Sequence, residues 1–129
     1  MKSPFLSLHD AEVARIEEET EYTVYDDMPE QAPYPYVNMG EMTAMDWSDK
    51  SKPGQEVYLT IHIWSQYKGR KEVVEMGDMV IRALTKVPLV LAPNFRIVLA
   101  ELDMDELIMD IDGITRHKIL RHRYLIEEV

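Results

Sequence analysis

Four histidines are the side chains of this sequence best suited to acid–base chemistry or metal binding near neutral pH. They are His9, His62, His117 and His122. None belongs to a His-Glu-x-x-His pair, in which two histidines one helical turn apart bind the same zinc ion. His117 and His122 are five positions apart in a segment with strand character, so they point to opposite faces of a sheet and cannot share a metal. We therefore expect structural or surface roles for the histidines.

Acidic residues concentrate in a second region that could hold a metal ion. The run is Asp103, Asp105, Glu106, Asp110 and Asp112, followed by Gly113. If Gly113 stood at the sixth position of an EF-hand loop, Ile108 and Ile119 would stand at its first and last positions, where oxygen ligands are required. A solvated turn is the better interpretation. Because no glycine-rich phosphate loop occurs either, we predict no metal, no cofactor and no enzymatic activity.

Length, composition and charge exclude several further classes of protein. The chain has 129 residues and is predicted to form a single domain, residues 1–129. Cysteine is absent, which excludes disulfides and thiolate metal sites. No run of about 18 apolar residues occurs, so we expect no membrane span. The formal net charge of −10 opposes general binding to nucleic acid, because Lys and Arg on phosphates supply most of that affinity.

Hydrophobic periodicity predicts an α+β fold. Helices are expected from Ser3 as N-cap and Pro4 to near Glu19, and over Arg70–Lys86. The expected strands are Tyr22–Tyr25, Tyr36–Glu41 (continuing after Thr43 or bulging at Gly40), Gln55–Ser65, Arg96–Met104 and Thr115–Ile126, the last two joined through Asp105–Gly113. The polar segment Asp46–Gly54 separates two strands and is predicted to form a long hairpin arm. Together these indicate an antiparallel sheet of about four strands with two helices packed on one face.

The strand over Gln55–Ser65 has two different faces. One face carries Val57, Leu59, Ile61 and Ile63, which we predict to form the core beneath the helices. The other carries Tyr58, Thr60, His62 and Trp64 and is too aromatic for an ordinary solvated face. We therefore expect Tyr58, His62 and Trp64 to be covered by a neighbouring subunit or by the arm.

The last strand is unusually basic for so acidic a chain. Within eight positions it carries Arg116, His117, Lys118, Arg121, His122 and Arg123. Two interpretations remain open. These residues could pair across the strands with Glu101 and Asp103. Alternatively they could form a basic edge that meets an acidic surface of another subunit, for instance Glu17–Glu19, as a heterologous interface would. Trp47, in the polar arm, is likewise either an exposed interface anchor or folded back over its own sheet.

An ordered set of short blocks carries a family resemblance. The blocks are V-Y-D-D-M-P at 24–29, A-P-Y-P-Y-V at 32–37, G-E-M-T at 40–43, D-W-S-D-K at 46–50, G-Q-E at 54–56 and I-H-I-W-S-Q-Y-K-G-R-K-E at 61–72. In this order and spacing they resemble the tail-completion, or tail-terminator, family of long-tailed bacteriophages. The helix–strand–strand remainder has the layout of that family.

The resemblance implies a structural protein of the virion, at the head–tail junction, assembled in the bacterial host cytoplasm. It implies a ring, usually of six subunits, that caps the head-proximal end of the tail tube, ends tube polymerisation and presents a surface to the head connector. The implied partners are other copies, the major tail tube protein and a head-completion or stopper protein. DNA would pass through the ring without specific binding, which suits an acidic chain.

The contacts of such a ring are predicted on four parts of the chain. The residues are Trp47, Lys50 and Lys52 in the arm, Tyr58, His62 and Trp64 on the strand face, and the charged residues Glu17, Glu18, Glu19, Arg116, Lys118, Arg121 and Arg123. Two other functions stay open: a different neck component, such as a head-completion or adaptor protein, and a host-encoded α+β domain that binds a small molecule or acts as an enzyme.

Overall fold

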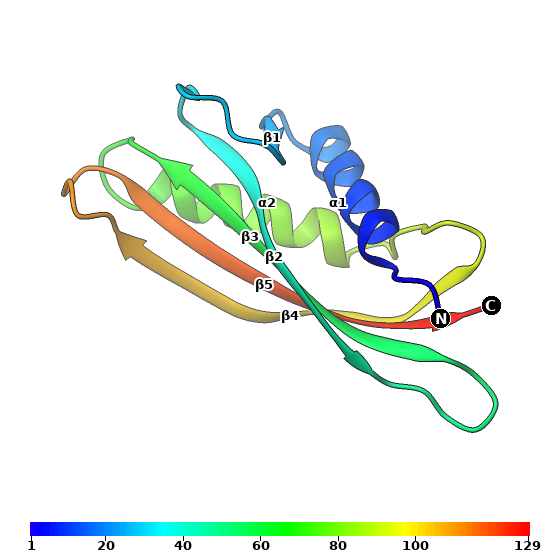
Figure 1. Cartoon of the computed structure of the whole chain (residues 1–129). Coiled ribbons are helices and arrows are strands. Elements are labelled where there is room, and N and C mark those ends of the chain that lie inside the picture. The colour runs from blue at the N-terminus through cyan, green and yellow to red at the C-terminus, as the bar shows by residue number, and fades with distance from the viewer.

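Two helices cover one face of a twisted five-stranded sheet in the computed structural model, which describes residues 1–129 (Figure 1). The elements are α1 (Phe5–Glu19), β1 (Val24–Tyr25), β2 (Tyr36–Asp46), β3 (Gly54–Ser65), α2 (Lys71–Thr85), β4 (Phe95–Met109) and β5 (Arg116–Glu128). The predicted α+β class is confirmed. The sheet has five strands rather than about four, because the two-residue β1 adds a short parallel pair beside β2. Neither helix is long and apolar enough to cross a membrane.

The strand order is β1-β2-β3-β5-β4, and all pairs except β1–β2 are antiparallel. β5 therefore lies inside the sheet, which does not agree with the basic edge, one of the two interpretations left open. β4 is also longer than predicted. Asp105 and Glu106 were expected in the connection to β5, but they pair with Leu120 and Ile119 in the β ladder. Lys118 holds Asp105 there by an ion pair of 2.7 Å, which explains how acidic residues continue the strand.

A bulge interrupts β2 where the sequence predicted one. The register with β3 shifts between Met39 and Met42, and the strand then continues to Asp46. Gly40 lies in this bulge against β3. A β-carbon there would come within 2.8 Å of the His62 ring and 2.9 Å of the Thr60 carbonyl oxygen, so only glycine allows this close approach.

The core lies between the helices and one face of the sheet. Val57, Leu59, Ile61 and Ile63 of β3 are fully buried there, as their alternation predicted. The stripe of α2 that packs on them consists of Val73, Met76, Val80 and Leu84, all fully buried. The helix α1 begins at Phe5, one residue later than expected, and the N–H of Phe5 donates to the Ser3 hydroxyl at 3.3 Å.

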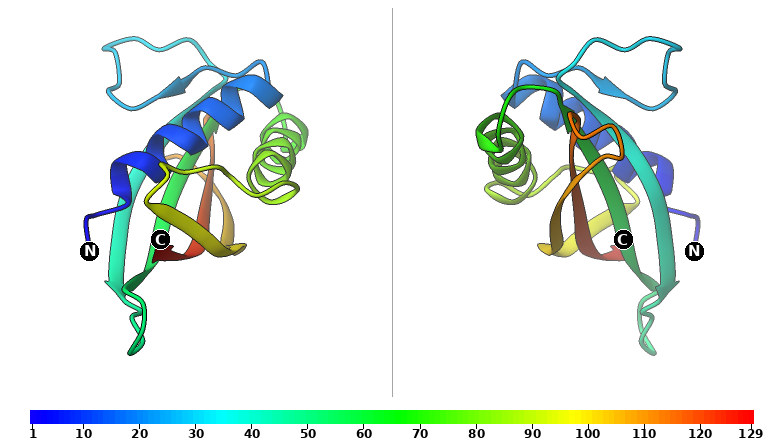
Figure 2. Two further views of the ribbon diagram at one scale, coloured as in Figure 1. Left: turned by 90° about the vertical axis from the view of Figure 1, so that its right-hand side faces the viewer. Right: turned by 90° about the vertical axis from the view of Figure 1, so that its left-hand side faces the viewer.

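The strands β2 and β3 extend beyond the helices and form the expected hairpin arm, which projects from the body of the molecule (Figure 2). The N–H of Trp47 donates to the Gly54 carbonyl at 2.8 Å and closes the ladder at the base of the turn. Within the turn, the Asp49 carboxylate accepts hydrogen bonds from the N–H groups of Ser51 and Lys52 at 2.7 and 2.8 Å. These bonds lower the pKa of Asp49.

Candidate assembly surface

The sheet face opposite the helices, here called the outer face, is not covered by any helix (Figure 2). Its centre is formed by the alternate residues of β3, among them Tyr58, His62 and Trp64, which are half-buried. The arm continues the sheet and does not fold across this face. Within the chain nothing further covers the three aromatic residues, and a neighbouring subunit remains the predicted cover.

Aromatic rings form a continuous ladder across one end of the outer face. Tyr34 lies 5.1 Å from Tyr36, which lies 6.4 Å from Trp64, measured between ring centroids. Trp64 stacks on His117 at 3.7 Å with an interplanar angle of 9°, and its indole N–H donates to the Asn38 side chain at 2.7 Å. The ladder joins β2, β3 and β5.

His117 and His62 meet at the end of this ladder. The Nε2 atom of His117 and the Nδ1 atom of His62 are 2.7 Å apart and hydrogen-bonded. Burial and the neighbouring His62 lower the pKa of His117 to about 4, so its ring is neutral at neutral pH. His122 lies on the opposite face of β5, as predicted, and is fully buried among the core residues. Sequence reasoning missed the His62–His117 pair, because only the register of β3 with β5 brings the two together.

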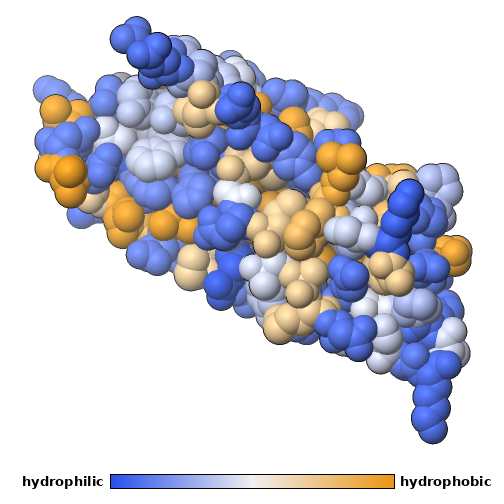
Figure 3. Space-filling model, in the orientation of Figure 1, coloured by the Kyte–Doolittle hydropathy of each residue, from blue (hydrophilic) through white to orange (hydrophobic).

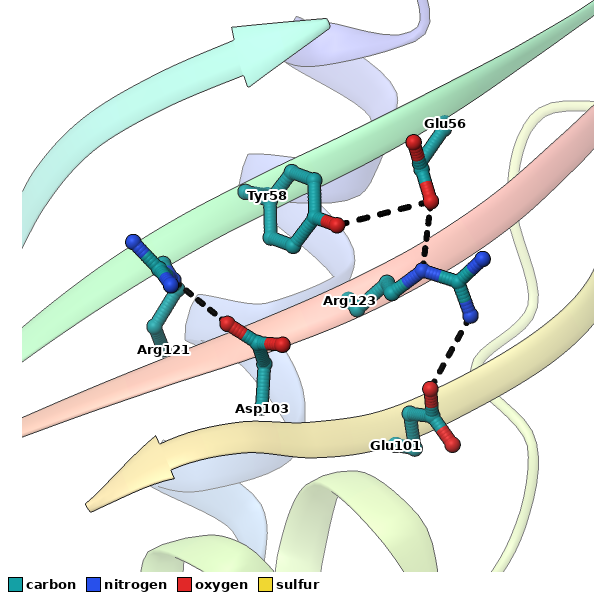
Figure 4. A network of polar contacts seen from close by, with 6 residues as sticks. All are labelled: Glu56, Tyr58, Glu101, Asp103, Arg121 and Arg123. Carbon is teal, nitrogen blue, oxygen red and sulfur yellow. Dashed lines mark hydrogen bonds and ion pairs between the residues drawn. The ribbon is translucent and has the colours of Figure 1, made fainter. Parts of the chain in front are cut away.

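Ion pairs occupy the middle of the outer face (Figure 4). The Arg123 guanidinium donates to Glu56 at 2.5 Å and to Glu101 at 2.9 Å, and these carboxylates raise its pKa. Arg121 pairs with Asp103 at 2.7 Å and lies 5.3 Å from the centre of the Tyr58 ring. The cross-strand pairing of Arg121 and Arg123 with acidic residues, one of the two open interpretations, therefore occurs within the chain.

Arg116 and Lys118 are separated from this network, because they have the opposite parity on β5 and face the helices. Lys118 is 5% exposed, and its side chain runs across Gly77 of α2, where a β-carbon would come within 2.3 Å of the lysine Cε. Its ammonium pairs with Asp105 at 2.7 Å. Arg116 donates to the Ile114 carbonyl at 2.5 Å. In this structure Lys118 belongs to the core and offers no contact to another subunit.

The other predicted contact residues lie at the ends of the molecule. Glu18 and Glu19 are exposed at the end of α1, whose last turn has no basic residue, and Glu17 approaches the N–H of Val24 at 3.5 Å. In the arm, Lys52 pairs with Glu127 at 3.5 Å, while Lys50 is exposed. The arm and the end of α1 lie at opposite ends of the molecule, so the structure does not gather these residues into one patch. Glu17 does lie near the aromatic ladder, because Val24 precedes Tyr25, whose ring centroid is 5.7 Å from that of Tyr36.

Trp47 agrees in part with each of the two interpretations left open for it, because it packs on its own hairpin and is also partly exposed. Its ring lies against Gly54 of the same hairpin, yet 40% of the residue remains exposed. A β-carbon on Gly54 would come within 2.7 Å of the Trp47 carbonyl oxygen and 3.0 Å of its ring. Glycine at position 54 therefore permits the close packing of Trp47 on its own hairpin, while the rest of the Trp47 side chain stays exposed.

Replacing Gly54 with alanine is expected to destabilise the chain by about 1–3 kcal/mol, the usual range for overpacking. The added methyl group must push the Trp47 backbone away and so weaken the hydrogen bond between the two residues. Urea denaturation followed by tryptophan fluorescence measures the loss. Gly69→Ala is not a suitable control because of its positive φ. Ser51→Ala, at the tip of the same arm, is suitable, and an equal loss in both variants would contradict the steric explanation.

A buried polar pair connects α1 to β5. Glu12 is fully buried, and the Tyr124 hydroxyl donates a hydrogen bond to its Oε2 atom, while Oε1 has no partner. Burial raises the pKa of Glu12 to about 8, although the Tyr124 bond opposes this shift. Both ring nitrogens of the nearby His122 also lack partners, and burial lowers the pKa of His122 to about 4. The sequence indicated only the burial of Glu12, which stands four residues after Leu8 and four before Ile16 on the same helix face. Nothing in the local sequence indicated its pairing with Tyr124.

The acidic run does not form a metal centre. No group of three or more His, Asp or Glu side chains is arranged to hold a metal ion. The Asp112 carboxylate instead accepts hydrogen bonds from the Thr115 hydroxyl at 2.6 Å and from the N–H groups of Thr115 and Ile114 at 2.8 Å, which lower its pKa. It stabilises the turn between β4 and β5, in which Gly113 has a φ of 71°.

Comparisons with known proteins agree with this architecture. The profile of the family described as "Tail completion protein gp17" matches residues 8–127. The tail completion protein gp17 of Bacillus phage SPP1 is 33% identical over 94 residues, which are 73% of this chain and 69% of that protein. The solved structure of bacteriophage SPP1 gp17 superposes with a TM-score of 0.61 at 27% identity, covering 92% of this chain and 88% of that one.

A chain in the virion of a native gene transfer agent particle is also similar, with a TM-score of 0.83 at 21% identity over 98% of this chain and 99% of that one. This second likeness concerns the fold. The two sequence matches identify the chain as a structural protein of a phage tail. The chain belongs to the tail completion protein gp17 family, which confirms the resemblance found in the sequence.

Proposed function

We propose that this chain forms a ring, of six subunits, that caps the head-proximal end of the tail tube at the head–tail junction. There it ends tube polymerisation and provides the docking surface for the head connector. Its partners in this function are other copies of the chain, the major tail tube protein and a head-completion or stopper protein. The ring assembles in the cytoplasm of the bacterial host, and no step of its assembly involves a membrane.

The observation that carries this proposal is the sheet itself, which has an uncovered outer face and two unpaired edges. β1 pairs only with Val37 and Asn38, so β2 has a free edge beyond Met39. On the other side, the whole of β4 has no partner beyond β5. Free edges can be completed by strands of neighbouring subunits, and the half-buried aromatic ladder is suited to burial against a partner.

Charge supports the same function. Arg121 and Arg123 are both paired with carboxylates on the outer face and so are not available to bind phosphates. The chain keeps its formal net charge of −10, and a ring of such subunits would let DNA pass without holding it. Specific binding of DNA is not required by any part of the proposal.

Mixing the purified chain with tail tubes tests the proposed function. We expect it to bind one end of each tube, seen by electron microscopy, and to stop further growth when free tube protein is added. Tubes that continue to grow at both ends would contradict the proposal. Binding to isolated heads or connectors, but not to tubes, would instead favour a different neck component.

Deleting Lys50–Pro53 is expected to lower tube binding by at least about tenfold, as loss of an interface anchor does. The deletion shortens the arm but retains Trp47 and Gly54, which are hydrogen-bonded to each other. Two residues then remain between them, enough for a tight hairpin turn. The shortened chain should therefore fold, which its thermal unfolding curve checks. Ser51→Ala, which retains the arm and both of its predicted contact lysines, is the matched control. Tubes capped normally by the deletion variant would show that the arm makes no essential contact.

A further inference from the structure

The turn between β4 and β5 presents a fully exposed apolar side chain. Ile111 is completely exposed, and Ile114 is 57% exposed. Figure 3 shows hydrophobic atoms gathered at the end of the molecule where this turn lies. Asp110 and Asp112, both exposed, flank Ile111. The side chain of Ile111 contributes nothing to the core, and with the partly exposed Ile114 it gives the turn an apolar surface that another chain can contact.

This turn, residues 110–114, is also rigid. The Asp112 carboxylate accepts three hydrogen bonds from Ile114 and Thr115, and the N–H of Asp110 donates to the Thr115 carbonyl at 2.8 Å. The N–H of Gly113 donates to the Asp110 carbonyl at 3.0 Å. Because the turn is already ordered, binding would lose little conformational entropy, which favours a role in association.

A hollow with complementary properties lies between the two helices. It has a volume of about 370 Å³, enough to receive the side chain of an isoleucine. Met79, Ala83 and Val87 form its apolar surface. Its rim carries three cations and one carboxylate: Arg15, Arg82, Lys86 and Glu19. We call this hollow the socket.

The three cations of the socket differ in their interactions with the rest of the chain. Arg15 donates to the carbonyls of Ala83 and Val87 at 3.1 and 2.8 Å, and so stabilises the end of α2. Arg82 and Lys86 are exposed and form no ion pair in the chain, although the chain carries ten more acidic than basic residues. The socket therefore has an apolar surface and a positive rim, whereas the 110–114 turn has an apolar centre and negative flanks.

The turn and the socket cannot meet within one chain. The turn follows β4 and precedes Arg116, which pairs with Ser65 near the start of α2, whereas the socket lies at the end of α2. Fifteen helical residues separate the two positions by roughly 20 Å, at 1.5 Å per residue. Figure 1 likewise shows the turn at one end of the molecule, beyond the start of α2. A contact between them must join two copies.

We infer that the 110–114 turn of one subunit docks in the socket of the next, with Ile111 on the apolar surface and Asp110 facing Arg82. The contact is heterologous, because it joins different surfaces of two identical chains, and such contacts build the proposed ring when the rotation between neighbours closes on itself. The inference deepens the proposed ring and rests on it. It assigns the subunit contact to surfaces that the sequence had not indicated.

Cysteine cross-linking tests the inference directly, because the chain has no cysteine of its own. The double variant Val87→Cys with Ile111→Cys places one thiol in the socket and one on the turn. After oxidation of this variant, alone at high concentration and bound to tail tubes, we expect a ladder of covalent oligomers on a non-reducing gel. Each single variant should stop at dimers, since one thiol per chain cannot extend a ladder. No ladder beyond the dimer in either sample would overturn the inference.

Exchanging charges gives a second measurement that does not depend on oxidation. We expect Asp110→Lys to weaken self-association at least about tenfold, and Arg82→Asp to do the same, since each places like charges together. The double variant should recover association, which a general loss of folding would not do. Failure of the double variant to recover would overturn the assigned contact.

Tube capping, scored on the same samples, separates the inference from the proposed function. Wild-type chain that caps tubes while the double-cysteine variant gives no ladder would leave the function intact and refute this contact. Wild-type chain that does not bind tubes would refute the function. A third outcome would also overturn the inference. If Ile111→Asp abolished capping while the charge-exchange variants self-associated as strongly as wild type, the turn would contact another virion protein and not a second copy.

Discussion

Replacing Glu12 with glutamine is expected to stabilise the chain relative to wild type by an amount that grows as the pH rises from 4.5 to about 8. Over this range the buried carboxyl keeps its proton in the folded state, while the unfolded chain has lost it. The unfolded state therefore binds fewer protons than the folded state, and the wild type loses stability as the pH rises. The loss is about 1.4 kcal/mol for each pH unit.

Glutamine removes this loss because it cannot ionise, and its amide oxygen can still accept the hydrogen bond from Tyr124. The quantity to measure is the difference in unfolding free energy between the variant and wild type, from urea denaturation at several pH values. A difference is measured because His122 changes the unfolding free energy with pH in the opposite direction, and it does so equally in both proteins. Its lowered pKa destabilises the folded chain as the pH falls below 6.5.

Glu18→Gln is the matched control, because Glu18 lies on the same helix and is exposed. For Glu18→Gln, the difference in unfolding free energy from wild type should not grow between pH 4.5 and about 8. A difference for Glu12→Gln that stays constant from pH 4.5 to 8 would mean that this carboxyl ionises normally in the folded chain.

Replacing Trp64 with alanine is expected to lower the free energy of unfolding by about 2–3 kcal/mol, somewhat less than for a fully buried aromatic residue. The change removes the stack on His117 and Tyr36 and the hydrogen bond to Asn38. Because the ladder joins three strands of the outer face, the same variant should also lose binding to tail tubes.

Trp64→Phe separates the two contributions. Phenylalanine keeps an aromatic ring on His117 but has no N–H for Asn38, so we expect a loss of about 1 kcal/mol, the usual net value of one hydrogen bond. Tyr67→Ala serves as control, since this nearby side chain is 64% exposed. Equal losses for Trp64→Ala and Tyr67→Ala would contradict a structural role for the ladder.

Much of the fold could be predicted from the sequence, because it depends on local periodicity. Alternation along Gln55–Ser65 identified the buried face of β3, and three- and four-residue spacing identified the stripe of α2. Turn-forming residues located the hairpin arm, and Gly40 indicated the bulge. The ordered blocks identified the family, because each block is a local pattern that can be read without a structure.

The tertiary structure decided which side chains meet. Glu12 and Tyr124 are 112 positions apart, and His62 and His117 are 55 apart. Such pairs depend on the order and register of strands that are distant in the sequence. The sequence left open whether β5 forms a basic edge or pairs across the sheet, and its place between β3 and β4 pairs Arg121 and Arg123 with acidic residues of the same sheet.

The sequence by itself determined the family, the class of fold and the core faces of β3 and α2, because backbone geometry makes these properties periodic along the chain. Only the tertiary structure placed Lys118 in the core, opened the socket between the helices and set the 110–114 turn at the far end from it. The reason is physical: periodicity tells which face a residue occupies, whereas strand order and helix packing determine what that face meets.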